Sequence, residues 1–237
     1  MAKIFSVSAR AVLATVVNPI ARTLLRLGVS PNAVTLAGVT GVLVGALGFG
    51  ARGHLIAGLV IVTLSALTDM LDGTMARMRG GASRFGALLD STMDRIADGA
   101  VFGAVTFWLA SQGDLAGAAA GLICLVAGQT VSYVKARAEG LGMTADVGIA
   151  ERTERLVIVG VGGFISGINS DWDWGLPAAL WILAALSLFT AGQRIVHVYR
   201  QDRAATTGGP AGGGRAGAVG DSRPPGAPGA GDGGGLR

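Results

Sequence analysis

Six stretches of this sequence are apolar over most of their length, and each is long enough to cross a lipid bilayer as a helix. A helix needs about 20 mostly apolar residues to span the hydrocarbon core. The stretches cover residues 33–51, 54–77, 84–110, 115–137, 153–169 and 176–199. We therefore expect an all-α integral membrane protein with six transmembrane helices.

The charged residues around these stretches predict how the chain is oriented. Apolar residues make up 51% of the 237 residues, charged residues only 14%, and the net charge is +4. Lys and Arg gather at the N-terminus, in the second and fourth connections and after the last stretch, whereas the other connections are poor in them. The positive-inside rule explains this pattern without a nucleic-acid partner. We expect a multi-pass protein of the cell (plasma) membrane with both termini cytoplasmic.

The two ends of the chain differ from the membrane region, which we place at residues 31–203. Within residues 1–30, apolar side chains and arginines interleave over 5–27, as in an amphipathic helix that lies in the membrane interface. A short helix packed on the transmembrane bundle is a second interpretation, and the two are compatible. Residues 204–237 are mostly Gly, Pro, Ala and Ser, a composition that predicts a disordered tail.

Four aspartates lie at the facing ends of the second and third apolar stretches. Asp69 and Asp72 are three residues apart, and Asp90 and Asp94 are four apart, so each pair shares one face of its helix. Glycines occupy positions 80–81, in the short connection between the two helices. The helices are then antiparallel neighbours, and the four carboxylates can converge on one point near the cytoplasmic side.

Carboxylates within membrane helices are costly and usually mark a functional site. An all-oxygen ligand set without His or Cys suits Mg²⁺ or Mn²⁺, and also Ca²⁺. Four carboxylates can bridge two such ions about 4 Å apart, an arrangement used in phosphoryl transfer. Arg77 lies beside them and could bind a phosphate. A divalent-cation transporter is a second interpretation of the four aspartates. A third is that they only neutralise nearby arginines, namely Arg77, Arg79, Arg84 and Arg95. Asp98, one turn further on, is a separate case and is expected to form a buried hydrogen bond or ion pair.

The spacing of this segment resembles the signature of the CDP-alcohol phosphatidyltransferases. The pattern D-x2-D-G-x2-A-R-x8-G-x3-D-x3-D is matched at every element, by Asp69, Asp72, Gly73, Ala76, Arg77, Gly86, Asp90 and Asp94. The arrangement of six spans is also similar, so the resemblance covers about residues 5–200. Members of this family transfer a phosphatidyl-type group from a CDP-linked lipid to an alcohol and release CMP.

The resemblance implies roles for individual residues. Asp69, Asp72 and Asp90 would bind one metal ion, Asp69, Asp90 and Asp94 would bind the other, and Asp94 would also be the general base on the acceptor hydroxyl. Residues that would contact CDP-diacylglycerol are Gly73, Arg77 and Ser83, together with Asn32 and Thr35 of a P-N-x-x-T segment. For Asn32 and Thr35, helix capping near Pro31 is the alternative interpretation. A homodimer is also expected from the family.

Cations around the fourth connection bear on the choice of acceptor. Lys135, Arg155 and Arg194 flank the cytoplasmic side of the last three stretches, and such a cluster would suit an acceptor that carries its own phosphate. Anchoring by the positive-inside rule is the alternative for each of them. The segments KARAEGLG and ERTERL resemble the actinobacterial phosphatidylinositol-phosphate synthases within the family, which implies inositol 1-phosphate as the acceptor. The phosphatidylglycerophosphate synthases share the signature and remain the close alternative.

Overall fold

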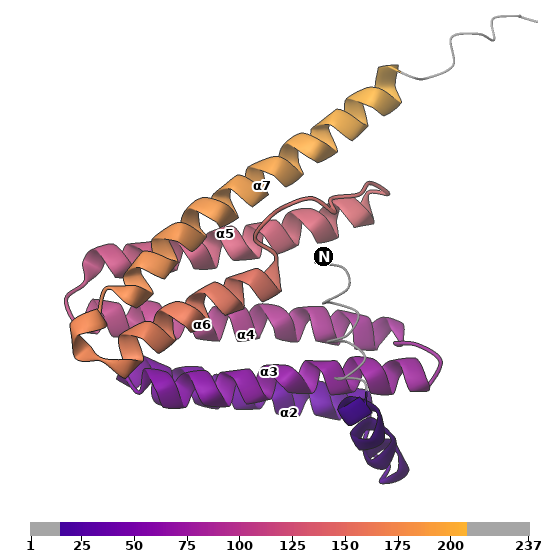
Figure 1. Cartoon of the computed structure of the whole chain (residues 1–237). Coiled ribbons are helices and arrows are strands. Elements are labelled where there is room, and N and C mark those ends of the chain that lie inside the picture. The colour runs from indigo at the N-terminus through magenta and orange to yellow at the C-terminus, as the bar shows by residue number, and fades with distance from the viewer. Residues whose placement is uncertain (1–14, 208–237) are drawn as a thin grey trace, which may run out of the picture.

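The computed structural model describes residues 15–207, and every regular element in that range is a helix (Figure 1). Residues 15–26 are helical and precede the bundle. The bundle consists of α2 (Pro31–Leu43), continued by a π-helical turn η1 (Val44–Phe49) and a 3₁₀ turn η2 (Gly50–Arg52), then α3 (Leu55–Met78), α4 (Arg84–Ser111), α5 (Leu115–Gly140), α6 (Arg152–Ile168), a 3₁₀ turn η3 (Ser170–Trp172) and α7 (Gly175–Thr207).

Each of the six predicted stretches coincides with a helix, which confirms the all-α assignment for the described residues. Four helical segments are long and apolar enough to cross a membrane: Pro31–Arg52, Leu55–Met78, Leu115–Gly140 and Gly175–Thr206. Helix α4 carries several charged residues, and α6 has only 17 residues. The protein is thus a multi-pass membrane protein, and the number of six spans stays a prediction.

Glycines allow the first two long helices to pack very closely. A Cβ atom on Gly58 of α3 would lie 3.0 Å from the carbonyl oxygen of Gly45 in η1. Gly38 and Gly41 of α2 face Thr68 and Ser65 of α3 in the same way. Small residues at such contacts let membrane helices approach through their backbones. The close contact fixes α2 against α3, and therefore the start of α2 against the acidic end of α3.

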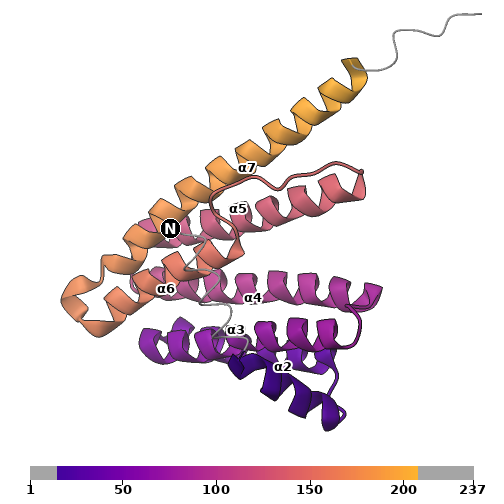
Figure 2. The ribbon, with the colours of Figure 1, turned by 45° about the vertical axis from the view of Figure 1, so that its right-hand side comes forward.

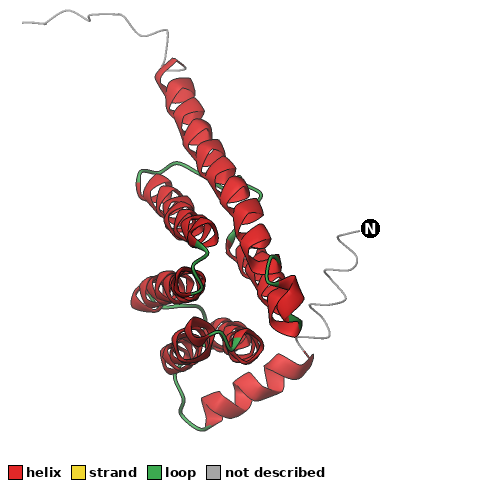
Figure 3. Cartoon of the chain, turned by 90° about the vertical axis from the view of Figure 1, so that its left-hand side faces the viewer, coloured by secondary structure: helices red, strands yellow, loops and turns green. Residues whose placement is uncertain are grey.

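The helices pack as one bundle around a small apolar core. Helix α2 contacts α3 and α4, α4 contacts α5, α5 contacts α7, and α6 contacts both α7 and α3. Figures 2 and 3 show this order from the side and nearly along the helices. Phe102, Leu176, Leu180 and Leu183 are fully buried, and the thiol of the buried Cys124 donates to the carbonyl of Leu180 at 3.2 Å. Many large apolar side chains instead point outward, as expected where lipid is the solvent.

The helix at residues 15–26 lies across one end of the bundle, close to the start of α2 and the end of α3 (Figures 1 and 3). Its Ala21 is fully buried in a cluster with Val34 and Met75, whereas Val16 and Ile20 are exposed. This contact confirms the interpretation as a helix packed on the bundle. Its position in the membrane interface stays a prediction, and the first part of the predicted helix, before residue 15, lies outside the described residues.

Helix α7 continues past the end of its apolar segment, to Thr207. The predicted span ended at 199, and residues 204–207, assigned to the tail, are helical. The segment RQDRAATT has no Gly or Pro, so nothing in it interrupts a helix until the glycines that begin at 208. The rest of the predicted tail, 208–237, lies outside the described residues.

Candidate active site

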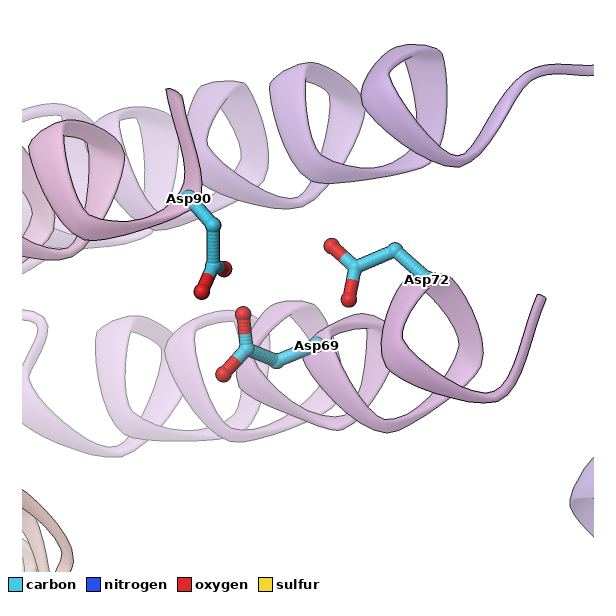
Figure 4. A group of neighbouring side chains, drawn as sticks. All are labelled: Asp69, Asp72 and Asp90. Atoms are coloured by element: carbon cyan, nitrogen blue, oxygen red, sulfur yellow. The ribbon is translucent and has the colours of Figure 1, made fainter. Parts of the chain in front are cut away.

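Three carboxylates from two helices meet in the bundle. Ligand oxygen atoms of Asp69 and Asp72 on α3 and of Asp90 on α4 all lie within 4.8 Å of one another (Figure 4). The connection between α3 and α4 turns on Gly80 and Gly81, whose φ angles of 95° and 121° favour glycine. The spacing predicted that four carboxylates converge; the structure groups these three, with Asp94 outside the cluster, and the tight glycine turn brings the two helices together.

Asp72 is the most buried of the three, and its partner comes from α2. The Thr35 hydroxyl donates to the Asp72 carboxylate at 2.5 Å, and both residues are buried. Ser30 caps α2 by accepting from the Ala33 amide at 3.2 Å, with Pro31 in the first turn. Thr35 thus orients a carboxylate of the cluster, and its predicted contact with the nucleotide stays a prediction.

Asp94 lies one turn further along α4 and has a different environment. Its carboxylate is 2.8 Å from Arg152 Nη1 and 3.7 Å from Arg95 Nη2. The interpretation that neighbouring arginines neutralise the aspartates is therefore confirmed in part, since Arg95 pairs with Asp94. Its main partner nevertheless comes from α6, far along the chain.

Arg152 is the cation that sequence reasoning did not assign to the site. Its guanidinium contacts three acids at once, Asp69 at 3.2 Å, Asp94 at 2.8 Å and Asp98 at 3.4 Å. The signal in the sequence was slight, a cation directly before the fifth apolar stretch. Only the packing of α6 on α3 brings Arg152 to the carboxylates.

A cavity of about 410 Å³ opens beside the three carboxylates. Of the residues predicted to contact CDP-diacylglycerol, Asn32, Thr35, Gly73 and Ser83 line it. Arg77 does not line it in this structure, and its Nη2 donates to the Thr74 hydroxyl at 2.9 Å. The lining also includes Ser30 and Arg79, which were not predicted to contact the substrate. The full lining is Ser30, Pro31, Asn32, Thr35, Asp69, Asp72, Gly73, Ala76, Arg79, Gly81, Ala82, Ser83, Gly86, Ala87 and Asp90.

Gly86 leaves room in the cavity beside the start of α4. Ser83 caps α4, its hydroxyl accepting from the Gly86 amide at 2.9 Å. A Cβ on Gly86 would lie 3.1 Å from that hydroxyl and 3.2 Å from the Asn32 side-chain oxygen. Glycine at this position keeps the space between Asn32 on α2 and Ser83 at the start of α4 open.

The three cations predicted to bind the acceptor all have protein partners. The Lys135 ammonium lies 2.5 Å from Asp146 and 4.0 Å from Glu139, and its hydrogen bond to Asp146 holds the pKa of that carboxyl below its usual value. Arg155 is buried and pairs with Asp98, which confirms the expected buried ion pair of Asp98.

Arg194 is buried as well, on α7. Its guanidinium donates to the carbonyl oxygens of Val131 and Val147 at 2.7 and 2.8 Å and to the Glu151 carboxylate at 3.1 Å. The structure thus places Arg155 and Arg194 within the scaffold around the fourth connection. Their contact with an acceptor phosphate stays a prediction.

The acidic cluster fits a divalent cation. Carboxylate oxygens are the ligands that Mg²⁺ and Mn²⁺ prefer, and three of them already lie close enough to share one ion. Asp72 is held by Thr35, as ligating carboxylates commonly are held by an outer hydrogen bond. Asp69, Asp72 and Asp90 could therefore hold a metal ion.

Comparisons with known proteins agree with this geometry. The sequence pattern of the CDP-alcohol phosphatidyltransferases matches residues 28–191. The chain is 50% identical to a phosphatidylinositol phosphate synthase of Mycobacterium marinum over 192 residues, 80% of this chain and 82% of the relative. A phosphatidylinositol phosphate synthase of Streptomyces avermitilis is 47% identical over 199 residues, 81% and 82% of the two chains.

Solved structures of a relative are similar as well. The crystal structure of the Mycobacterium tuberculosis phosphatidylinositol phosphate synthase with CDP-DAG bound has a TM-score of 0.76 and 47% identity, over 78% of this chain and 94% of that chain. The structure of the same enzyme in complex with manganese and citrate has a TM-score of 0.72 and 46% identity, over 77% and 88%. Sequence pattern, fold and the acidic cluster agree: this chain is an enzyme of the CDP-alcohol phosphatidyltransferase family.

Proposed function

We propose that the protein transfers the phosphatidyl group of CDP-diacylglycerol to inositol 1-phosphate, giving phosphatidylinositol phosphate and CMP. The observation that carries the proposal is the cluster of Asp69, Asp72 and Asp90 beside the cavity of about 410 Å³. The choice of substrates is supported by relatives at 47–50% identity that are phosphatidylinositol phosphate synthases. The enzyme would act in phospholipid synthesis.

Two divalent ions, Mg²⁺ or Mn²⁺, would be held by the acidic residues. One would lie among Asp69, Asp72 and Asp90, and the other among Asp69, Asp90 and Asp94. When bound, such ions neutralise the diphosphate and stabilise the attacking and leaving oxygens. Gly73, Ser83 and Asn32 line the cavity in which the CDP moiety would lie, Thr35 holds Asp72, and Arg77 is one turn from Gly73.

The chemistry assigned to the chain's own groups is a single displacement. The acceptor hydroxyl gives its proton to Asp94 as general base. Its oxygen bonds to the phosphorus that carries the diacylglycerol, and the bond from that phosphorus to the bridging oxygen of CDP breaks, so that CMP leaves. Arg152, which is 2.8 Å from Asp94, would attract the acceptor's own phosphate, together with Lys135, Arg155 and Arg194.

The arrangement in the membrane is part of the proposal. Six spans would place both termini and the acidic cluster on the cytoplasmic side of the plasma membrane, because the basic connections lie at that end. Residues 31–203 would form the catalytic domain, residues 1–30 the interfacial helix, and 204–237 a disordered tail. Exposed Trp172, Trp174 and Trp181 would mark the outer interface, and two copies would form a homodimer.

A direct assay tests the proposed reaction. Purified protein is supplied with labelled CDP-diacylglycerol and Mg²⁺ or Mn²⁺, and CMP release is followed with inositol 1-phosphate, glycerol 3-phosphate or inositol. We expect product only with inositol 1-phosphate and only with the divalent ion. Turnover with glycerol 3-phosphate instead would identify a phosphatidylglycerophosphate synthase. Divalent-cation uptake into proteoliposomes without CMP release would favour a transporter.

Replacing Lys135 by alanine is expected to raise KM for inositol 1-phosphate while KM for CDP-diacylglycerol changes less than about twofold. A lost charge-assisted contact costs about 1.5–3 kcal/mol, which corresponds to roughly a tenfold to hundredfold effect. The matched control is Arg137→Ala, because Arg137 lies two residues away on a different face of α5. An unchanged KM for the acceptor in Lys135→Ala would show that the acceptor phosphate binds elsewhere.

A further inference from the structure

The connection between α5 and α6, residues 141–151, is attached to one face of α7. Three residues of α7 hold it, namely Thr190, Arg194 and Gln201. Their spacing of four and seven places them on the same side of the helix. The last residue of the connection precedes Arg152, which contacts the carboxylates of the site. The connection therefore joins α7 to the site, through hydrogen bonds at one end and the start of α6 at the other.

Thr190 makes the attachment nearest to the site. Its hydroxyl oxygen accepts from the backbone amides of Ile149 at 3.2 Å and Ala150 at 3.1 Å. Thr190 and Ala150 are both fully buried. A buried amide such as that of Ala150 needs a partner, and the same hydroxyl also serves the partly buried amide of Ile149. Removing the hydroxyl would leave the buried Ala150 amide, and the partly buried Ile149 amide, without this acceptor.

Gly148 lets the connection approach Thr190 closely. Its φ angle is 136°, which an L side chain rarely adopts, and a Cβ there would overlap the Thr190 methyl group. The backbone of the connection thus packs directly on Thr190. Further out, the Gln201 side chain accepts from the Thr144 amide at 3.1 Å and donates to the Thr144 carbonyl at 2.6 Å.

The attachment has a direct consequence for the site. Ala150 is two residues before Arg152, whose guanidinium contacts Asp69, Asp94 and Asp98. In addition, the Arg155 amide donates to the Glu151 carbonyl in the first turn of α6. A shift of the connection would move the start of α6, and with it Arg152, relative to the carboxylates on α3 and α4.

We infer that Thr190 is a positioning residue for the reaction: its hydroxyl fixes the amides of Ile149 and Ala150 and thereby sets Arg152 against Asp69 and Asp94. Gly148 serves the same attachment from the other side. Thr190 touches neither substrate nor the reacting atoms and acts through Arg152. The kinetic part of this inference rests on the proposed function, whereas the attachment itself does not.

The test compares Thr190→Val, which keeps the shape and loses the hydroxyl, with Thr190→Ser, which keeps the hydroxyl. Hydrogen exchange at Ile149 and Ala150 is measured by mass spectrometry in the full chain, without substrate. We expect exchange about tenfold faster in Thr190→Val and near wild type in Thr190→Ser, in line with one lost buried hydrogen-bond partner. Thr206→Val is the control, because the Thr206 hydroxyl bonds within α7, to the carbonyl of Asp202.

Kinetics then show whether the attachment matters for the reaction. In Thr190→Val we expect kcat to be about tenfold lower than in the wild type and KM for CDP-diacylglycerol to change less than about twofold. Thr190→Ser should restore kcat to near the wild-type value. Retained CDP-diacylglycerol binding shows that the variant is folded; if it does not fold, Gly148→Ala must show the same pattern. Wild-type kcat in a folded Thr190→Val, or failure of serine to rescue, overturns the inference. If the wild type uses another phosphorylated alcohol, the proposed acceptor is wrong and the same comparison is made with that alcohol.

Discussion

Replacement of Asp69 by asparagine is expected to abolish both divalent-metal binding and turnover. Asp69 is, with Asp90, one of two residues shared by the two predicted metal positions, and its carboxylate also contacts Arg152. An amide keeps the shape but loses the charge, so the cluster of three carboxylates loses one of the two anions that both ions would share. We expect kcat/KM to fall at least about a thousandfold, since the ions supply several kcal/mol of charge stabilisation.

Mn²⁺ titration followed by electron paramagnetic resonance measures the binding directly, and CMP release measures turnover. Asp94→Asn is the informative comparison, because Asp94 lies outside the cluster of three and is paired with Arg152. We expect this variant to keep Mn²⁺ at the cluster but to lose about 10²–10⁴-fold in kcat, the contribution of a general base. Full activity in Asp94→Asn would disprove the assignment of the base. Asp173→Asn, in the connection before α7, is the charge control.

The positions of the helices followed from the sequence because lipid imposes a length and a polarity on each of them. The starts of α2 and α4 could also be predicted, because both depend on local conformation. Ser30 and Pro31 favour a helix start at α2, and the glycines at 80–81 favour a turn before α4. The extension of α7 to Thr207 could not be predicted, because a polar helix beyond the membrane leaves no signal in the hydropathy of the sequence. The four aspartates were placed correctly at one end of two neighbouring helices, since their spacing depends only on helix periodicity.

Local spacing could not predict which residues of distant helices contact one another. Arg152 is 83 residues from Asp69 in the sequence, and Arg155 is 57 residues from Asp98, so their contacts depend on how α6 packs on α3 and α4. Arg152 and Arg155 are also three residues apart on one helix, and sequence alone does not distinguish two cations at the start of one apolar stretch. Burial separates them: Arg155 is only 1% exposed, whereas Arg152 reaches the acids of the site.

The buried pair of Arg155 and Asp98 leads to the second large effect, on stability. Asp98→Ala would leave the Arg155 guanidinium buried without its carboxylate, and breaking a buried pair in this way costs about 3–5 kcal/mol. We expect Arg155→Met to destabilise the protein by a similar amount, because Asp98 is then left uncompensated except by Arg152. Thermal or denaturant unfolding in detergent gives the free energy of unfolding.

The double variant Asp98→Ala/Arg155→Met separates the structural role of Arg155 from its predicted role at the acceptor. Because both buried charges are gone, we expect it to be more stable than the sum of the single losses predicts, by about 1–3 kcal/mol. If Arg155 also binds the acceptor phosphate, the double variant regains stability but keeps a raised KM for inositol 1-phosphate. Strict additivity of the two losses would contradict the pairing, while recovery of both stability and KM would assign Arg155 to the scaffold and leave the acceptor phosphate to Lys135 and Arg152.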